Sequence, residues 1–378
     1  MASTPLTRKT SLKRRLSFVL VTYLAFLLVL LAIEAGTRLT MGHVSSLDLF
    51  VVTSQQKAQV ADAKQSTIFE GDPLLLWRLK PNLDHVVWDF TVVSTNPEHF
   101  RSVDPLQSLK PKPEGAIRVV CLGDSVTFGY RVPAVWPEKP TEFDPEWLPY
   151  PMLLEKHLRA ANPGRNIEVI TMAVPGYTSH QGLAWLRRDI NRLEPDLITV
   201  SFGWNDVSFS DAPDREAIDT GWRAVGLRWL INNSQAFAHA TRWFRSRQPA
   251  AAIVRKPVAR VSEEEYLNNF REFIRLARGK GASIIIVAAP YRDGTTNPPE
   301  AALMGRYRAA LGSLARQDHL TFLQVLELTE AAYPANEGWF GELIHPNHMG
   351  HRLIASELLE LFAANRMLKD TNIPVLVP

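Results

Sequence analysis

Short apolar runs and segments with helical spacing alternate along the C-terminal two thirds of the chain. Five largely apolar runs are candidate strands: Ile117–Leu122, Ile167–Thr171, Leu197–Phe202, Ser283–Ala288 and Thr321–Val325. Five segments carry apolar residues at helical spacing: Pro151–Ala161, Gln181–Arg192, Glu263–Lys280, Glu300–Gln317 and Asn347–Ala363. This alternation indicates parallel strands joined by crossover helices, and apolar strands are typical of a sheet covered on both faces. We therefore predict an α/β fold, a three-layer α/β/α sandwich with a five-stranded parallel sheet.

The N-terminal region has a different pattern, an uncharged apolar run from Leu16 to Ile33 that is long enough to cross a bilayer core. Glu34 and Arg38 follow the run, and five basic residues precede it: Arg8, Lys9, Lys13, Arg14 and Arg15. This asymmetry predicts one transmembrane helix, with the N-terminus in the cytoplasm and the rest of the chain in the periplasm or outside the cell. A cleaved signal peptide is the alternative, although no clear A-x-A site follows the run.

These patterns divide the chain into three parts. Residues 1–41 are predicted to form a basic cytoplasmic tail and transmembrane anchor. Residues 42–113 form an irregular lead-in segment that is expected to pack on the main domain, and prolines mark its end. Residues 114–378 form that main domain.

Within these parts, three stretches carry weaker signals. Ser54–Lys64 could form a short helix, and Val86–Ser94 has strand character. Residues 211–261 interrupt the alternation of strands and helices and predict a helical insertion. Its aromatic residues at roughly helical spacing fit either a lid or surface packing, and they are Trp222, Trp229, Phe237 and Trp243.

Composition and charge exclude several classes of protein. The chain has 378 residues, of which 46% are hydrophobic and 21% charged, so neither a disordered nor a fibrous protein fits. The formal net charge is only +3, and much of the basic charge lies in the N-terminal tail, so no nucleic-acid partner is predicted. The single cysteine, Cys121, excludes an intrachain disulfide, a cysteine cluster for zinc and a CxxC redox pair.

Candidate chemistry lies in the loops that follow the strands, because ligands bind beyond the carboxyl ends of an open parallel sheet. Gly123-Asp124-Ser125 follows the first candidate strand. A serine at such a turn is exposed, and the helix that begins there offers backbone N–H groups to a developing anion. Thr127 stands where the G-x-S-x-G elbow has its last glycine, and no G-K-[ST] follows, so neither an α/β-hydrolase elbow nor a phosphate loop is indicated.

Two further loops supply groups that could bind an anion. Gly176, in a Pro-Gly turn after the second strand, could let a ligand approach the backbone and donate its N–H. Asn205, after the third strand, could donate an amide N–H to an oxyanion. Asp206 is expected to fix this loop by bonding backbone groups. Taken singly, each of these features also fits an ordinary turn.

A candidate general base lies near the C-terminus. His345 precedes a proline and is expected in a loop that then starts a helix. Glu342 could bond its Nδ1 and leave Nε2 to take a proton from serine. The alternative is a metal site of Glu342, His345, His348 and His351, but three-residue steps on a helix rotate roughly 60° backwards each time, so these side chains would not converge. We predict no metal and no cofactor, with His348 and His351 at the helix start or on its solvent side.

Taken together, these four segments resemble the SGNH/GDSL hydrolase superfamily in order and in strand-end position. The resemblance covers about Ile117 to Ala363 and implies the flavodoxin-like SGNH hydrolase fold. It also implies a catalytic group and an oxyanion hole: Ser125 as nucleophile, His345 as general base and Glu342 as acid, with the Ser125 N–H, the Gly176 N–H and the Asn205 side chain as oxyanion donors.

Two positions depart from the pattern of that superfamily. Glu342 stands where aspartate is usual, and its extra methylene could change the orientation of the imidazole. Thr171 stands where asparagine is common, five residues before the oxyanion glycine.

The resemblance implies a serine esterase that forms an acyl-enzyme. Together with the anchor, it leads us to expect O-acetyl or short-chain O-acyl esters of envelope carbohydrates or lipids as substrates, and the membrane as a partner. Two alternatives remain open: an O-acyltransferase that uses the same acyl-enzyme, and a catalytically silent, membrane-tethered binding module. Activity lost to chelators would instead indicate a metal-dependent hydrolase. The oligomeric state is not predicted.

Overall fold

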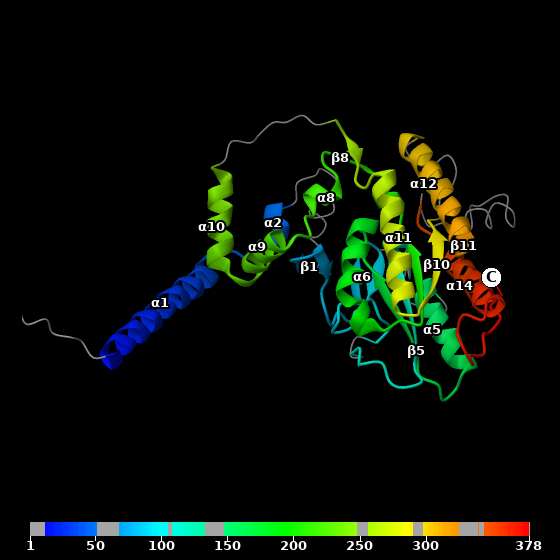
Figure 1. Ribbon diagram of the computed structural model, residues 1–378, viewed down its shortest axis with the longest axis horizontal. Coiled ribbons are helices and arrows are strands. Elements are labelled where there is room, and N and C mark those ends of the chain that lie inside the picture. The colour runs from blue at the N-terminus through cyan, green and yellow to red at the C-terminus, as the bar shows by residue number, and fades with distance from the viewer. Residues whose placement is uncertain are drawn as a thin grey trace, which may run out of the picture.

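The centre of the molecule is a five-stranded parallel sheet with helices on both faces (Figure 1). A computed structural model describes residues 12–50, 68–104, 108–132, 147–247, 256–289, 298–324, 339 and 344–377. The strands of the sheet are β5 (Ile117–Gly123), β6 (Ile167–Ala173), β7 (Leu197–Ser201), β10 (Ser283–Ala288) and β11 (Thr321–Gln324). They lie in the order β11-β10-β7-β5-β6, so the second strand along the chain lies outside the first and the later strands extend the other edge. This order is that of the flavodoxin-like class, with its switch point between β5 and β7.

Five long helices form the outer two layers of the sandwich. They are α5 (Tyr150–Ala161), α6 (Ser179–Leu193), α11 (Glu263–Gly279), α12 (Pro298–Gln317) and α14 (His348–Ala364). Side chains alternate along β5: Val119 and Cys121 pack with residues of α5 and α14, whereas Val120 and Leu122 pack with residues of α6, α11 and α12. All five predicted strands and all five predicted helices are confirmed where the structure describes them, with ends within two residues of the predicted ones.

The lead-in segment contributes short elements along one side of the domain. They are α2 (Ser46–Phe50), β1 (Phe69–Asp72), β2 (Leu76–Leu79), β3 (Val86–Trp88) and β4 (Thr91–Val93). Leu75, Trp77 and Phe100 share a hydrophobic cluster with the sheet. The predicted helix over 54–64 lies outside the described residues, and the boundaries at residues 41 and 113 stay predictions.

The strand character predicted for Val86–Ser94 is confirmed, but in two short strands, β3 and β4, and not in one. The chain folds there into an antiparallel hairpin that pairs Val86 with Val93. Asp89 and Phe90 form the turn with φ of 39° and 59°. Two successive positive φ values are those of the turn type that matches the twist of a two-residue hairpin.

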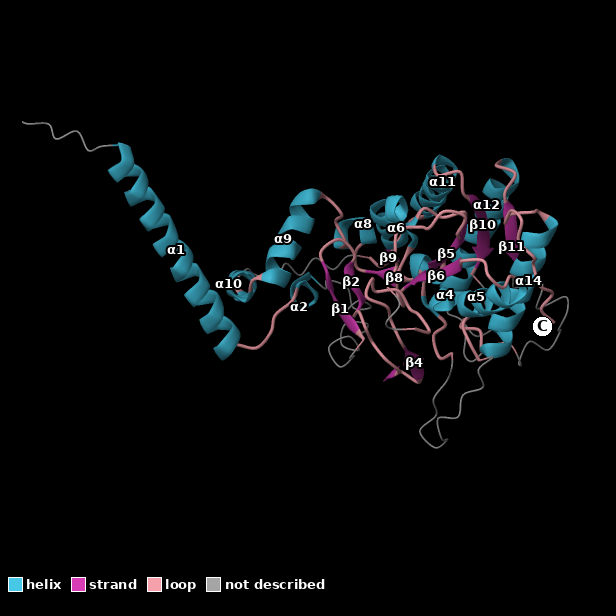
Figure 2. Cartoon of the chain, turned by 90° about the horizontal axis from the view of Figure 1, so that it is seen from below, coloured by secondary structure: helices cyan, strands magenta, loops and turns pink. Residues whose placement is uncertain are grey.

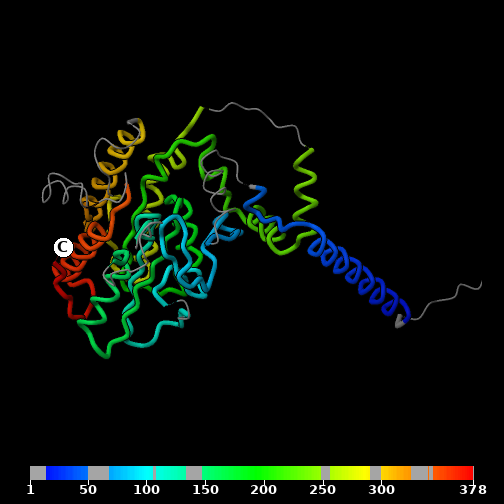
Figure 3. The backbone as a smooth tube through the Cα atoms, turned by 180° about the vertical axis from the view of Figure 1, so that it is seen from behind, coloured from blue at the N-terminus to red at the C-terminus, as the bar shows by residue number. Residues whose placement is uncertain are grey.

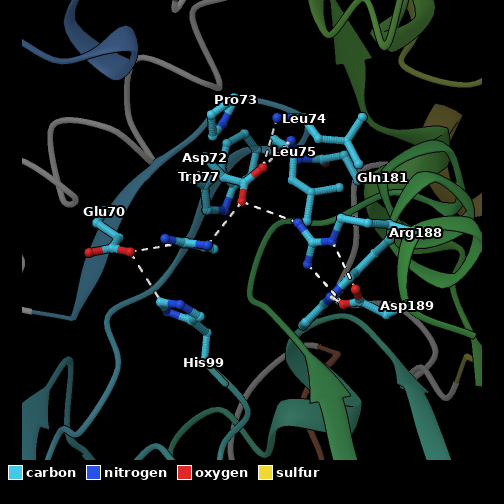
Figure 4. Close-up of polar contacts among 12 residues, drawn as sticks. Glu70, Asp72, Pro73, Leu74, Leu75, Trp77, His99, Gln181, Arg188 and Asp189 are labelled. Carbon is cyan, nitrogen blue, oxygen red and sulfur yellow. Dashed lines mark hydrogen bonds and ion pairs between the residues drawn. The ribbon is translucent and has the colours of Figure 1, made fainter. Parts of the chain in front are cut away.

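A buried carboxylate attaches the β1–β2 hairpin to α6 (Figure 4). Oδ1 of Asp72 accepts the backbone N–H groups of Leu74 and Leu75 at 2.8 and 2.7 Å. Its Oδ2 lies 3.4 Å from Arg188 on α6 and 3.5 Å from Arg78 on β2. The Asp72 carboxylate is almost fully buried, and both of its oxygens have polar partners. It therefore fixes both the turn of the hairpin and the distance between the hairpin and α6.

The described part of the insertion contains the helices α8 (Asp214–Ala217), α9 (Trp222–Asn233) and α10 (Gln235–Ser246). Its base is closed by antiparallel pairing of β8 (Phe209–Ser210) with β9 (Val258–Ala259). A lid and surface packing were the two interpretations of this segment, and the contacts of α9 and α10 favour packing. The α9 helix packs on α2 and β1, and α10 packs on the N-terminal helix. In Figure 1 both helices lie beside that helix, at the end of the molecule away from β10 and β11.

The N-terminal helix α1 (Leu12–Thr40) projects from one end of the molecule, and the C-terminus lies at the opposite end (Figure 3). Its stretch Arg14–Thr40 is long and apolar enough to cross a membrane, and the most apolar window within it has a mean hydropathy of 2.8. None of its most apolar window is buried against the rest of the protein. A helix that is apolar on all sides and uncovered does not have the pattern of a core helix.

Candidate active site

Ser125 is the first residue of the short helix α4 (Ser125–Phe128), directly beyond the carboxyl end of β5. Asp124 caps this helix, and its Oδ1 accepts the Val126 N–H at 3.0 Å. A side chain at Gly123 would approach the Ser201 carbonyl oxygen to 2.9 Å and overlap Thr127, so the tight turn requires glycine there. The Gly-Asp-Ser sequence thus sets the position of the serine at the sheet edge.

The Ser125 hydroxyl is hydrogen-bonded to His345. Its Oγ lies 2.8 Å from His345 Nε2, although the two residues are 220 positions apart in sequence. With the imidazole proton on Nδ1, Nε2 is an acceptor and can take the serine proton. This is the contact between nucleophile and base that nucleophilic catalysis requires.

His345 is held by the elements on either side of it. It directly precedes Pro346 and Asn347, and Asn347 Oδ1 caps α14 by accepting the Gly350 N–H at 3.1 Å. The imidazole ring of His345 packs against the ring of Tyr130, with centroids 4.6 Å apart. The Tyr130 hydroxyl in turn donates to Asp89 in the β3–β4 turn. The lead-in segment therefore supports the imidazole through Tyr130.

The oxyanion candidates Gly176 and Asn205 lie at the same sheet edge as Ser125. In the sheet, Gly123 is paired with Ala173 of β6 and with Ser201 of β7, so the three loops start from one row. Gly176 has φ of 83°, which favours glycine. Asn205 lies on α7 (Trp204–Val207), and its Nδ2 is 3.4 Å from Asp124 Oδ2, next to the serine.

Two aspartates near these loops are buried and have raised pKa values. Burial raises the pKa of Asp124 to about 6, although the Val126 N–H and His345 both favour its charged form. Burial raises the pKa of Asp206 to about 8, against the hydrogen bonds from Ser179. Asp206 Oδ1 accepts the backbone N–H of Ser179 at 2.9 Å, which is the loop-fixing role expected for this residue.

The backbone at Gly176 is held by a buried ion pair that the sequence patterns did not reveal. The Arg260 guanidinium donates to the Gly176 carbonyl at 3.0 Å and to both carboxylate oxygens of Asp214, at 3.0 and 2.8 Å. Asp214 also accepts the Thr178 hydroxyl at 2.7 Å. Both charged side chains are essentially inaccessible to solvent. A lone arginine in the sequence gives no signal of such burial.

A second buried arginine, also missed in the sequence, holds the other side of the nucleophile loop. Arg101 of the lead-in segment donates to the carbonyl groups of Phe128, Gly129 and Val132, the last two at 2.8 and 2.6 Å. Burial lowers the pKa of Arg101 to about 9. The lead-in segment therefore fixes the loop after α4.

The remaining C-terminal candidates have different roles. His348 is the first residue of α14, as expected, and its ring packs on Trp147 at 4.7 Å. His351 lies in the first turn of α14, which agrees with the helix-start alternative, but it is buried and not on the solvent side. Its Nδ1 accepts the Tyr150 N–H at 3.1 Å, and burial lowers its pKa to about 3. Glu342 lies outside the described residues.

His345, His348 and His351 thus face three different partners, namely Ser125, Trp147 and Tyr150. Among the residues that the structure describes, no group of three or more His, Cys, Asp or Glu side chains is arranged to hold a metal ion.

Comparisons with known proteins add the following findings. Residues 121–353 match the GDSL-like lipase/acylhydrolase family. An acetyl-xylooligosaccharide esterase from Geobacillus stearothermophilus is 20% identical, with a TM-score of 0.41 over 65% of this chain and 93% of the esterase. A lipase/acylhydrolase from Enterococcus faecalis is 16% identical, with a TM-score of 0.41 over 68% of this chain and 98% of that one. No match is found among curated proteins.

The family match spans more than half of the chain, from the middle of β5 into α14, and includes every candidate site residue. It confirms the resemblance inferred from the four strand-end segments. The chain belongs to the GDSL-like lipase/acylhydrolase family and is a hydrolase of ester bonds with the SGNH α/β fold.

Proposed function

We propose that this enzyme is a membrane-anchored serine esterase that removes acetyl or other short acyl groups from carbohydrates or lipids of the cell envelope. The observation that carries the catalytic part is the 2.8 Å contact between Ser125 Oγ and His345 Nε2 at the carboxyl end of β5. We assign Ser125 as the nucleophile, His345 as the general base and Glu342 as the acid that orients it.

The reaction follows from this pair of side chains. Ser125 Oγ attacks the ester carbonyl carbon while its proton passes to His345 Nε2. The tetrahedral intermediate collapses, the acyl–oxygen bond breaks and His345 returns the proton to the leaving alcohol. Water then attacks the carbonyl carbon of the acyl-serine and gives a proton to Nε2. The bond between the acyl carbon and Ser125 Oγ breaks, His345 returns the proton to Oγ, and the carboxylic acid is released.

The negative charge that develops on the carbonyl oxygen needs donors already in place. We assign the Ser125 N–H, the Gly176 N–H and the Asn205 side chain to this oxyanion hole. Their loops follow Gly123, Ala173 and Ser201, which are paired with one another across the sheet. The Gly176 carbonyl also accepts a hydrogen bond from Arg260. Donors fixed in this way stabilise the transition state without reorganising during the reaction.

The proposed location rests on α1. Basic residues precede its apolar run, and Glu34 and Arg38 follow it, so we assign the N-terminus to the cytoplasm and the catalytic domain to the periplasm or the cell exterior. A tethered hydrolase on that side meets envelope polymers and lipids, and O-acyl esters of these are the substrates we propose. Water is the acceptor that we propose, because α9 packs on α2 and β1 and α10 packs on α1, which does not support a lid over the site.

The substrate proposal is tested with the full-length protein in detergent or vesicles. We expect it to release acetate from 4-nitrophenyl acetate and from acetylated oligosaccharides, with rates that fall as the acyl chain lengthens. The free acid and any newly acylated alcohol are measured together in the presence of a sugar acceptor. Acylated acceptor in place of free acid would establish the acyltransferase instead, and preference for long acyl chains would contradict the short-acyl assignment.

Arg260 is expected to act as a positioning residue for the oxyanion loop. Arg260→Leu leaves Asp214 buried without its partner and should lower the free energy of unfolding by roughly 3–5 kcal/mol. The double variant Arg260→Leu/Asp214→Leu removes both charges and should recover much of that stability. We nevertheless expect its kcat to stay about tenfold low, because a misplaced donor stabilises the oxyanion less well.

Denaturant unfolding measures the free energy of unfolding of each variant, and steady-state kinetics at the same temperature give kcat and KM. A kcat that recovers together with stability in the double variant would show that Arg260 matters for folding alone. A loss confined to KM would also contradict the positioning role, since the oxyanion forms only in the transition state.

A further inference from the structure

The α9–α10 segment, residues 222–247, has a basic and aromatic surface. It contains no acidic residue and five arginines: Arg223, Arg228, Arg242, Arg245 and Arg247. Arg228 is buried, but the other four are exposed. Large aromatic side chains are exposed beside them: Trp222 at 80%, Trp229 at 55%, Trp243 at 57% and Phe244 at 61%.

Two of these arginines lie over tryptophan rings. The Arg223 guanidinium lies 5.2 Å from the Trp222 ring centre, and that of Arg247 lies 3.9 Å from Trp243. Trp222 and Trp229 are seven positions apart on α9 and therefore share one face of it. The surface thus combines cationic groups with flat amphipathic rings.

Hydrogen bonds join the start of α10 to Glu34 and Arg38 near the end of α1. Glu34 accepts the backbone N–H groups of Gln235 and Ala236 at 2.9 and 3.0 Å and the Ser234 hydroxyl at 2.8 Å. Arg38 donates to the Asn233 carbonyl at 2.9 Å and is paired with Glu34. The two helices and the turn between them are therefore joined to the last turns of α1.

That point of attachment coincides with the outer end of the apolar run. At 1.5 Å per residue, Leu16–Ile33 is about 27 Å long and fills the hydrocarbon core, so Glu34 lies at its boundary. Figure 2 shows α10 end-on while α1 runs across the picture, so their axes cross steeply. If α1 spans the bilayer, α10 extends along the membrane surface instead of into solvent.

We propose that residues 222–247 form a second membrane contact, a helix pair that lies on the outer surface of the bilayer and binds anionic lipid headgroups. This proposal rests on α1 being the membrane anchor. Tryptophan is enriched at membrane interfaces, where its ring sits at headgroup level, and arginines there bind lipid phosphates. The neighbouring side chains at the end of α1, Leu39 and Met41, are exposed as well and continue the apolar surface.

This contact would fix the height and orientation of the catalytic domain. The α9 helix packs on α2 and β1, and β1 is tied to α6 through Asp72 and Arg188. Lipid binding at α9 and α10 therefore holds the sheet at a set distance from the membrane, instead of leaving it free to move on a single helix.

The test uses the full-length protein in vesicles of phosphatidylcholine, alone or mixed with phosphatidylglycerol. Ala240→Cys, on the exposed surface of α10, carries a polarity-sensitive fluorophore, and Ala309→Cys, exposed on α12, is the matched control. Cys121 is buried, and the labelled native chain gives its background. A quencher attached to lipid near the headgroup reports which probe lies on the bilayer, and carbonate extraction reports whether α1 is inserted.

We expect several-fold stronger quenching at position 240 than at 309, and more quenching with phosphatidylglycerol than without it. Arg242→Gln/Arg245→Gln/Arg247→Gln should remove the effect of phosphatidylglycerol while the protein resists carbonate. An unquenched, water-exposed probe on carbonate-resistant protein would overturn the proposal but leave the anchor intact. A shielded but unquenched probe would mean that a second copy or another protein covers this surface, and would also overturn it. Release by carbonate would refute the anchor instead.

Discussion

Ser125→Ala is expected to lower the rate of ester hydrolysis by about 10⁵-fold or more, because the only nucleophile in the proposed mechanism is removed. The variant should fold normally. The Ser125 hydroxyl bonds His345, while the cap of α4 comes from Asp124 and the turn from Gly123. A fluorophosphonate should add once to the native chain and not to the variant, as read by intact mass of the full-length protein.

Ser313→Ala is the matched control for this prediction. Ser313 lies on α12, and its hydroxyl donates to the Ala309 carbonyl of the same helix. We expect this variant to keep both the adduct and the hydrolytic rate. An adduct that persists in folded Ser125→Ala protein would place the reactive group elsewhere, and absence of any adduct on the native chain would contradict an activated serine.

The sheet and its helices could be predicted because local patterns determined them. The strands of the sheet are nearly all apolar, and several helices begin at capping residues such as Thr178, Ser262 and Asn347. Strand ends in turn located Ser125, Gly176 and Asn205, since function in an open parallel sheet lies beyond its carboxyl edge. Serine and histidine could be paired only through the family resemblance, because 220 residues separate them.

The features that were missed depend on contacts between distant segments. Arg101 and Arg260 are charged residues for which the sequence predicts exposure, yet both are buried against backbone carbonyl groups of the site loops. His351 follows the same three-residue spacing as His345, but it is buried against Tyr150 of α5. The turn at Asp89 interrupts a run that otherwise has uniform strand character. Propensity and periodicity describe one segment at a time and cannot report such partners.

The insertion illustrates the same limit. Aromatic residues at helical spacing predicted helices, and α9 and α10 are present. Which surface they cover depends on Glu34, some 200 positions away, which holds the start of α10. A lid and a membrane-facing helix pair have similar sequence patterns, and only the contacts with α1 distinguish them.

Asn205→Ala is expected to lower kcat by about 10²–10³-fold with little change in KM. The amide donor stabilises charge that develops on the carbonyl oxygen only in the transition state, so its loss affects the chemical step more than substrate binding. Steady-state kinetics with 4-nitrophenyl acetate give the two constants, and thermal unfolding checks that the variant is folded. A decrease of less than tenfold, or one carried by KM, would remove Asn205 from the oxyanion hole.

An indirect effect through Asp124 is the competing explanation, because Asn205 Nδ2 lies 3.4 Å from its Oδ2 and Asp124 adjoins the nucleophile. The Asp124→Asn variant distinguishes a direct role of Asn205 from this indirect one. Asparagine preserves the cap of α4 but replaces the carboxylate that Asn205 contacts. If Asn205 donates to the oxyanion directly, its replacement by alanine should cost nearly the same factor in the Asp124→Asn background as in the native chain. If Asn205 instead acts by holding Asp124, Asn205→Ala should cause little further loss of kcat in the Asp124→Asn background, since the contact between the two side chains is already altered there.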